Sequence, residues 1–425
     1  MAEAVAAGLA LAPDARTALL PTLVLFAAGS LLAILAARSL SGSGPGFLIL
    51  SGALLRATLL LRSPDLSDDV KRYAWDARVS AAGISPYAHA PLDPAVAVLA
   101  PETAASLPHA DVRTVYPPAA QAAFRSARLL SESALPLKAI FAAADLSVVA
   151  LVYGLGGPSA GFAAALYAFH PLPVTESAGQ GHLDSLGVAL LLASLVDLAR
   201  ARPVRAGAAF ALAVMTKYVP VFAALPLLRR GRLRFAAVSL AVGATLWIAA
   251  TSGGVSPLGG LSDYAESWEF NSIAYPALET LLEETAVPER AKELFSNWKG
   301  RPAWAQPLFE AFHAGFFARA ALAILLAVAL AVIAWRVRDV EAAVFASLAA
   351  LLLASPTLHP WYLLWILPFA ARRKSAAFLY LSFAVALSYA LLYPVSWLPR
   401  PAVYALEYGP FAALSAWSAF ARRAA

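Results

Sequence analysis

Apolar segments long enough to cross a lipid bilayer recur along this chain. The first covers residues 17–37, and 21 helical residues span about 30 Å of hydrocarbon. Further apolar segments cover residues 46–61, 137–156, 160–172, 186–198, 235–251, 316–335, 375–393 and 401–420. Together they predict an all-α, polytopic integral membrane protein with a bundle of about 11–13 helices.

The composition agrees with a single transmembrane domain over residues 1–425. The chain is 60% hydrophobic and 14% charged, against roughly 25% charged in an ordinary soluble domain. It contains no cysteine, which excludes disulfides, thiol catalysis and thiolate metal sites. The net charge of +6 comes from short basic clusters beside apolar segments, a topology signal rather than a nucleic-acid surface. Residues 1–13 lack a basic start, so we expect no cleaved signal peptide.

Arginines flank both ends of two apolar regions, residues 206–228 and residues 340–371. A simple crossing would place positive charge on both sides of the membrane, against the positive-inside rule. Each region also has a helix-breaking middle, TKYVP at 216–220 and SPTLHP at 355–360. We therefore predict two broken hairpins that enter and leave on the cytoplasmic side. The alternative, in which both hairpins cross fully and only their tips reach the far side, stays open.

This topology places the functional-looking segments on one face. With two hairpins, the N-terminus, the first loop (residues 62–136), the loop around His182 and the second large loop (residues 252–315) are all external. We expect the large loops to carry short amphipathic helices. The two hairpin apices point to the same external face.

The most charged stretch, SDDVKRYAWDARVSAAGISPY at 67–87, opens the first loop. Asp68 and Asp69 suit a general base acting on a hydroxyl, or a pair that binds a divalent cation. The alternative is an ordinary helix start with Ser67 as N-cap and acids in the first turn. On a helix, Asp68 shares one face with Arg72 and Asp76, and Asp69 lies on the neighbouring strip with Tyr73.

Two further groups carry polar chemistry. Glu176, Gln180, His182 and Asp184 offer no third metal ligand locally, so we expect them to bind a sugar or a phosphate; the alternative is a solvated loop in which Asp184 caps the next helix. Lys217 lies in the middle of a hairpin, where its natural partner is a phosphate or a buried carboxylate. The alternative is a lysine that reaches to a helix end.

The second apex, HPWYLLW at 359–365, is rich in aromatic residues. His359, Trp361 and Tyr362 suit a stacking platform for a sugar or an isoprenoid chain. The alternative is the aromatic belt found at any membrane interface.

Five segments resemble, in order, those of the prokaryotic polyprenyl-phosphate-mannose-dependent mannosyltransferases of the GT-C superfamily. They are SDDVKRYAWDARVSAAGISPY, TVYPPAAQAAF, ESAGQGHLDSL, TKYVPVFAALPLL and SPTLHPWYLLWILPF, within residues 65–369. Ala77 stands where the family has the Gly of WDGR, and Ser85 where it has the Asn of NPY. Residues 17–37 resemble an addition before the family's first core helix.

The resemblance implies a metal-independent inverting glycosyltransferase in the cell membrane, with its active site on the extracytoplasmic side. It would move a hexose, mannose by the resemblance, from a polyprenyl-phosphate donor to a glycolipid or glycan hydroxyl. It implies no cofactor, membrane lipids as partners, and no nucleic acid. The rival function is a lipid or sugar transporter, which broken helices and a midplane lysine also suit. A transporter needs sites open to both faces, whereas the polar chemistry here is predicted on one.

The expected site residues follow from the motifs and the resemblance together. The base is Asp69 or Asp68, and the sequence does not choose between them. The expected donor phosphate and sugar ligands are Lys217, Arg72, Lys71, His359, His182 and Asp184. The expected acceptor or lipid groove consists of Tyr73, Trp75, Asp76, Arg78, Tyr116, Trp361 and Tyr362.

Overall fold

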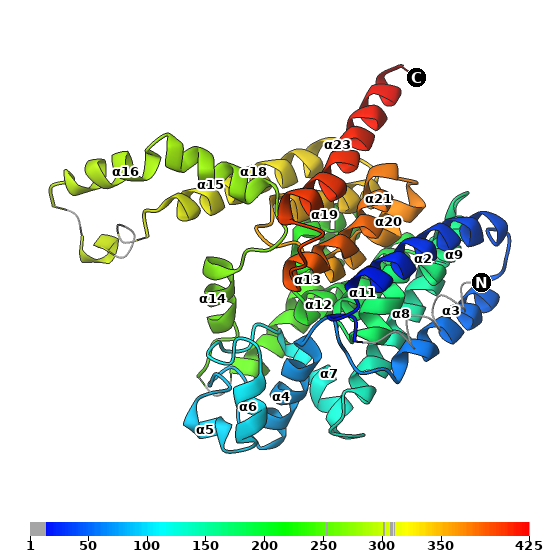
Figure 1. Ribbon diagram of the computed structural model, residues 1–425, viewed down its shortest axis with the longest axis horizontal. Helices are drawn as coiled ribbons and strands as arrows, with labels where there is room; N and C mark the ends of the chain where they lie inside the picture. The colour runs from blue at the N-terminus through cyan, green and yellow to red at the C-terminus, as the bar shows by residue number, and fades with distance from the viewer. Residues whose placement is uncertain (1–13, 252–253, 301, 307–308, 310, 425) are drawn as a thin grey trace.

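Helices make up most of the chain, as the apolar segments predict (Figure 1). The computed structural model describes residues 14–251, 254–300, 302–306, 309 and 311–424. Within that part of the chain the extended pairing is a single isolated bridge between Phe270 and Thr357. The prediction of an all-α architecture is confirmed.

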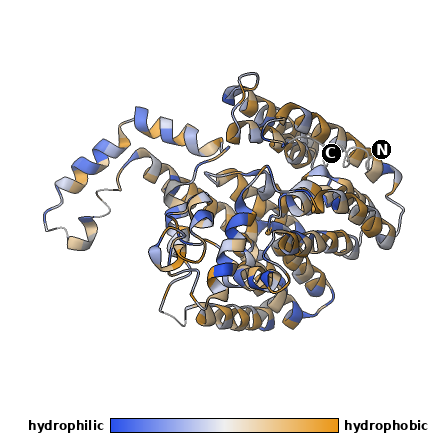
Figure 2. Cartoon of the chain, turned by 60° about the horizontal axis from the view of Figure 1, so that its bottom comes forward, coloured by the Kyte–Doolittle hydropathy of each residue, from blue (hydrophilic) through white to orange (hydrophobic). Residues whose placement is uncertain are grey.

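Four described helical segments are long and apolar enough to cross a membrane, and Figure 2 shows apolar residues along the helices of the bundle. They are α2 (Leu19–Ser39), α8 (Leu135–Gly154), Leu233–Thr251 within α13 (Ala224–Thr251), and α18 (Ala314–Arg336). Shorter apolar helices are α3 (Pro45–Leu60), α9 (Ala160–Phe169), α12 (Pro203–Thr216) and α19 (Val340–Ala354). Ile324, Leu325 and Val328 of α18 are exposed, as expected of a face that lipid covers. The chain is a multi-pass membrane protein.

The first predicted hairpin contains the expected break. α12 ends at Thr216, Lys217 is extended, and the short 3-10 helix η2 (Val219–Ala223) leads into α13. A proline at position 220 cannot continue the α-helical hydrogen bonding of α12, which explains where the break lies.

Contacts between α12 and α13 show that the chain returns after this break. Ser239 donates to the carbonyl of Gly207 at 3.1 Å, and Met215 lies against Gly243. The later part of α13 therefore runs parallel to α12, so the chain must come back to the level of Gly207 first. Leu233–Thr251 is a candidate membrane span of its own, which agrees with the predicted separate span at 235–251.

The second predicted hairpin is confirmed by an ion pair between its two ends. α19 leads to an extended apex, and the 3-10 helix η4 (Pro360–Trp365) and α20 (Leu367–Arg372) return. Arg372 pairs with both carboxylate oxygens of Glu341, in the first turn of α19, at 2.7 and 2.8 Å. The region therefore enters and leaves at the same end of the bundle.

That end of the bundle collects basic side chains. Arg372 also donates to the carbonyls of Val152 and Gly156 where α8 ends, and Arg373 pairs with Asp339. Arg229 donates to the carbonyl of Val337 after α18. We call this the arginine end, and the two hairpin apices lie away from it.

The loops at the other end carry short helices, as predicted. The first loop contains α4 (Asp69–Ala81), α5 (Pro94–Ala97), α6 (Pro101–Ser106) and α7 (Pro118–Arg128). The second contains α14 (Gly259–Ser267), α15 (Ala274–Glu284), α16 (Val287–Ser296) and η3 (Ala303–Ala305). Figure 1 shows α15 and α16 projecting from one side of the bundle. The chain closes with α21 (Ala376–Ala384), η5 (Val385–Ser388), α22 (Tyr389–Leu392) and α23 (Arg400–Ala424).

The sequence predicts a polar loop around His182, but this segment is buried in the bundle and partly helical. α9 stops at Phe169, the three-residue α10 (Pro171–Pro173) follows, and the π-helix η1 (Val174–Gly179) bends by 118° toward α11 (Asp184–Ala199). Every residue from 170 to 185 is buried. Burial is tolerated because polar partners from other segments meet these side chains.

One buried ion pair joins the helices beside this bend. Arg56 of α3 contacts the Asp145 carboxylate of α8 at 2.5 Å, and the Tyr167 hydroxyl donates to the same carboxylate at 2.6 Å. Arg56 also donates to the carbonyl of Ala168 at 2.9 Å. The pair satisfies two charges that would be costly alone inside an apolar bundle.

Candidate active site

The two leading carboxylates of the first loop have different partners. Asp68 accepts from the Arg16 guanidinium at 2.9 Å and from the Lys71 ammonium at 2.8 Å. Partial burial opposes its ionisation, but these two hydrogen bonds outweigh burial and leave the pKa of Asp68 below its usual range. Asp68 is therefore held as a paired anion.

Asp69 is the first residue of α4, and a buried histidine lies near its carboxylate. The Asp69 Oδ2 atom lies 3.6 Å from Nδ1 of His182. Burial raises the pKa of Asp69 to about 6, Lys217 lowers it, and the charges of Asp184 and Asp68 raise it. One third of the side chain remains exposed, so the carboxyl group can still meet a substrate.

His182 is fully buried at the turn between η1 and α11. Its backbone N–H donates to the carbonyl of Glu176 at 2.8 Å, and its Nε2 atom lies 3.5 Å from Oε2 of the same residue. The preceding Gly181 has a φ of +76°, and a Cβ there would come within 3.0 Å of Lys138 and 3.2 Å of Val70. Only glycine fits this turn, which brings His182 against α4.

Lys217 lies at the first hairpin apex and is held by a carboxylate. Its ammonium donates to Oδ1 of Asp184 at 2.7 Å, and the indole N–H of Trp365 donates to the same oxygen at 2.6 Å. The ammonium also lies 4.5 Å from the centre of the Tyr362 ring, a cation–π contact. The sequence predicts a phosphate or a buried carboxylate as the partner of Lys217, and in the structure this partner is the buried carboxylate of Asp184.

Four rings from three distant segments form one continuous stack. His182 stacks on Trp361 at 3.9 Å, Trp361 on His359 at 4.4 Å, and His359 on Phe270 at 4.4 Å between ring centres. Phe270 is placed by the backbone bridge to the second apex: its N–H donates to the carbonyl of Pro356, at 3.1 Å. Both large loops and both hairpins therefore meet at one site.

A tyrosine pair closes the side of this stack. The hydroxyl groups of Tyr264, in α14, and Tyr362 lie 2.5 Å apart. Tyr73 of α4 contacts Tyr116 edge to face at 4.8 Å and stacks on Phe124 at 4.5 Å. Asp69 and Asp184 both act electrostatically on Tyr73, so Tyr73 and Tyr116 border the site.

Four expected site residues form contacts within the first loop instead of at the site. Arg72 pairs with Asp76 at 3.1 Å and donates to the carbonyl of Val112 at 2.9 Å. Asp76 also accepts from Thr114 and Gln121. Trp75 is 2% exposed in a small core with Val79 and Val96, and Arg78 pairs with Glu132. These contacts hold the loop together, and Lys71 contacts Asp68 rather than Asp69.

The structure thus brings together seven of the expected residues and adds others. The seven are Asp69, His182, Asp184, Lys217, His359, Trp361 and Tyr362. Sequence reasoning did not select Tyr264, Phe270 or Trp365 for the site, nor Tyr389, whose hydroxyl donates to Glu176 at 2.6 Å. An isolated aromatic residue in an apolar chain carries no motif, and its role here depends on which segment packs beside it.

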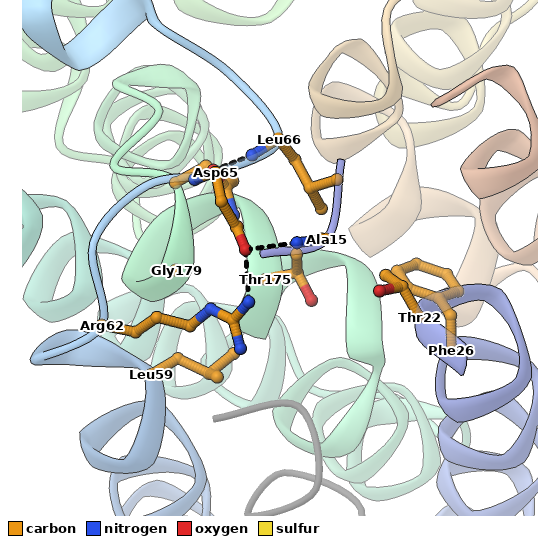
Figure 3. Close-up of a pocket in the computed structure, with 10 residues that line it drawn as sticks. Ala15, Thr22, Phe26, Leu59, Arg62, Asp65, Leu66, Thr175 and Gly179 are labelled. Atoms are coloured by element: carbon orange, nitrogen blue, oxygen red, sulfur yellow. Dashed lines mark hydrogen bonds and ion pairs between the residues drawn. The ribbon is translucent and has the colours of Figure 1, made fainter. Parts of the chain in front are cut away.

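A small pocket lies next to the site, between the start of α2, the end of α3 and η1 (Figure 3). The Asp65 carboxylate accepts from the backbone N–H of Ala15 at 2.9 Å and pairs with Arg62. The amide of Gln180 donates to the same carboxylate at 3.1 Å. This network ties the segment before α2 to the first loop.

The profile of glycosyltransferase family 87 matches residues 114–356, more than half of the chain. This region contains His182, Asp184 and Lys217; Asp69 precedes it and His359 follows it. No curated protein and no solved structure matches the chain.

Proposed function

Because the chain belongs to glycosyltransferase family 87, we propose that it is an inverting mannosyltransferase using a polyprenyl-phosphate mannose donor. The acceptor is a hydroxyl of a lipid-linked sugar or glycan, and the reaction takes place on the extracytoplasmic face of the cell membrane. The observation that supports this proposal is that Asp69 and the cationic Lys217 lie at one site built by both loops and both hairpins. Within the described part of the chain, Asp69 forms no ion pair with a lysine or an arginine. The family match favours this transferase over the transporter alternative.

Asp69 is the general base of this proposal, and Asp68 is not. A base must be ionised at working pH yet basic enough to take a proton from the acceptor hydroxyl as its oxygen attacks the sugar. Asp69, with a pKa of about 6, meets both conditions near pH 7. Asp68 is already neutralised by Arg16 and Lys71, which makes it a weaker base.

Lys217 stabilises the leaving group. The donor is a phosphodiester with one negative charge, and the departing polyprenyl phosphate gains a second as the bond to the sugar breaks. An ammonium fixed in advance stabilises this developing charge without reorganisation. Asp184 and Trp365 fix Lys217, and 19% of the lysine side chain stays exposed for the phosphate.

The arginine end supports the orientation of the site. Basic residues flank membrane spans on the cytoplasmic side, and Arg229, Arg372 and Arg373 lie at the end away from the apices. The site then faces outward. Nucleotide sugars are made in the cytoplasm, so a donor anchored by a lipid is the chemistry that suits an outward-facing transferase. The proposal needs no metal ion, since Lys217 supplies the positive charge.

The test uses the purified protein in lipid nanodiscs with radiolabelled polyprenyl-phosphate mannose and a lipid-linked mannoside acceptor. We expect transfer with inversion at the anomeric carbon, read by NMR of the product, and release of polyprenyl phosphate. Transfer should persist in excess EDTA. GDP-mannose, offered without polyprenyl phosphate, should give no product. Transfer from GDP-mannose alone, or retention of configuration, would contradict the proposal.

The choice of sugar is tested with matched donors. Polyprenyl-phosphate glucose and polyprenyl-phosphate arabinose differ from the mannose donor only in the sugar. We expect the highest kcat/KM with mannose. A preference for another sugar would keep the reaction class and correct the substrate.

A further inference from the structure

We propose that Glu176 and His182 are positioning residues that hold the Asp69 carboxylate through a one-way chain of hydrogen bonds starting at Tyr389. This inference rests on the proposed role of Asp69 as the base. It adds two side chains that do not touch the substrate and act through Asp69.

The four side chains lie in a line. The Tyr389 hydroxyl donates to Oε1 of Glu176 at 2.6 Å, and Oε2 of Glu176 lies 3.5 Å from Nε2 of His182. Nδ1 of His182 lies 3.6 Å from Oδ2 of Asp69. The last two separations exceed a hydrogen bond by a few tenths of an ångström, and such contacts tighten when substrate binds. Glu176 and His182 are both 0% exposed.

Among the described residues, the atoms in the middle of this line have no hydrogen-bond partner. Both ring nitrogens of His182 and the Oε2 atom of Glu176 are buried without a hydrogen bond. Buried polar atoms without partners are costly. Nε2 of His182 and Oε2 of Glu176 face each other, and Nδ1 of His182 faces Asp69, which indicates a connection. The stack on Trp361 and the backbone hydrogen bond to Glu176 fix the orientation of the His182 ring.

Counting donors and acceptors gives the chain its direction. A neutral imidazole has one N–H and one lone pair, and an ionised carboxylate only accepts. Burial and the nearby Lys217 ammonium disfavour a positive charge on His182, so the imidazole is neutral. It faces a carboxyl group at each nitrogen, so one of the two carboxyls must carry a proton. Asp69 must be ionised to act as the base. Glu176 is then the protonated partner, and it donates to Nε2 while Nδ1–H donates to Asp69.

Other charged and titratable groups also face this line and affect its pH dependence. Lys217 and Asp184 act on Asp69 from the first hairpin and α11, and Asp68 acts from α4 itself. Tyr73 of α4 lies beside Asp69. His359 and Lys217 face His182 from the two apices. None of these is changed in the variants below.

The first test compares substitutions that keep or remove one donor. His182→Asn keeps an N–H where Nδ1 lies, whereas His182→Ala removes it. Glu176→Gln keeps a donor toward His182 and an acceptor toward Tyr389, whereas Glu176→Ala keeps neither. We expect His182→Ala and Glu176→Ala to lower kcat by about 10- to 100-fold, the value of a hydrogen bond to a charged group. His182→Asn and Glu176→Gln should stay within about 5-fold of the wild type, and donor KM should be unchanged in all four.

The second test reads Asp69 directly and needs no substrate. A hydrophobic carbodiimide labels protonated carboxyl groups, and mass spectrometry of the Asp69 peptide gives the labelled fraction against pH. Loss of the His182 donor removes a hydrogen bond to the ionised form, so the labelling midpoint should rise in His182→Ala and stay near the wild-type value in His182→Asn. The acid limb of kcat should shift in the same direction.

Two tyrosines provide a matched control. Tyr389→Phe removes the hydroxyl 2.6 Å from Glu176. Tyr167→Phe removes a hydroxyl 2.6 Å from the buried Asp145, a carboxylate that pairs with Arg56 and is not part of the proposed chain. We expect only Tyr389→Phe to lower kcat, by about 3- to 10-fold. Thermal unfolding of each variant separates lost folding from lost positioning.

The outcomes distinguish the two proposals. If the wild type transfers mannose but the labelling midpoint of Asp69 is the same in His182→Ala, the relay is wrong while the proposed function stands. Equal losses in Glu176→Gln and Glu176→Ala would also overturn it, because a charged Glu176 would then be required. If the wild type transfers nothing, the function falls, and the labelling experiment still decides whether His182 holds Asp69.

Discussion

The pH dependence of transfer tests the assignment of the base most sharply. The reaction needs ionised Asp69, whose pKa is about 6. At pH 5 about one tenth of the carboxyl groups are ionised, so kcat should be about 10-fold below its plateau at pH 7.5. The sign is fixed: activity is lost as pH falls through about 6 and is retained above it.

Substituting each carboxylate separately gives opposite results. Asp69→Asn removes the base and should lower kcat by about 100- to 10,000-fold at every pH. Asp68→Asn removes a negative charge that raises the pKa of Asp69. It should lower kcat less than about 10-fold and move the acid limb to lower pH by about half a unit, an interaction of roughly 0.7 kcal/mol between partly solvated charges.

The assay is kcat at saturating donor between pH 4.5 and 8.5, at constant ionic strength, in nanodiscs. Asp93→Asn is the matched control, because Asp93 lies in the same loop and caps α5, where asparagine caps equally well. It should leave both kcat and the acid limb unchanged. An inactive Asp68→Asn beside an active Asp69→Asn would refute the assignment, and so would an acid limb that Asp68→Asn moves upward.

Three further predictions concern stability and packing. The raised pKa of Asp69 means that the folded state loses stability as pH rises from about 4, where the unfolded chain ionises, to about 6, so Asp69→Asn should stabilise the protein at pH 7.5 by about 1 kcal/mol after allowance for its exposed third, and by less at pH 4.5; a lower melting temperature at pH 7.5 would argue against this. Gly187→Ala would place a Cβ 2.4 Å from the Trp365 ring, so it should cost about 1–3 kcal/mol and lower kcat by displacing a partner of Asp184; Gly46→Ala, with open space around it, should do neither. Arg56→Met leaves Asp145 buried without its cation and should destabilise by about 3–5 kcal/mol in thermal unfolding, whereas an unchanged melting temperature would show that the pair is not structural.

The sequence determined the class of fold because lipid imposes a strong rule. Backbone groups in hydrocarbon must bond within their own helix, so long apolar segments can be predicted one at a time. Proline and arginine positions likewise located both hairpins, since a helix break and a charge bias are local properties. The motif residues Asp69, His182, Lys217 and His359 stood out because polar side chains are rare in this chain.

Only the tertiary structure decided what these residues do to one another. Asp68 and Asp69 are adjacent in sequence, and they differ because Arg16, from the segment before α2, reaches one of them and His182, more than a hundred residues later, approaches the other. Arg72 and Asp76 looked equally functional, yet they pair with each other inside the first loop. Phe270 and Tyr389 carry no motif and belong to the site only through their contacts with His359 and Glu176. Charge state and partner depend on distance through space, which neighbouring letters in a sequence do not specify.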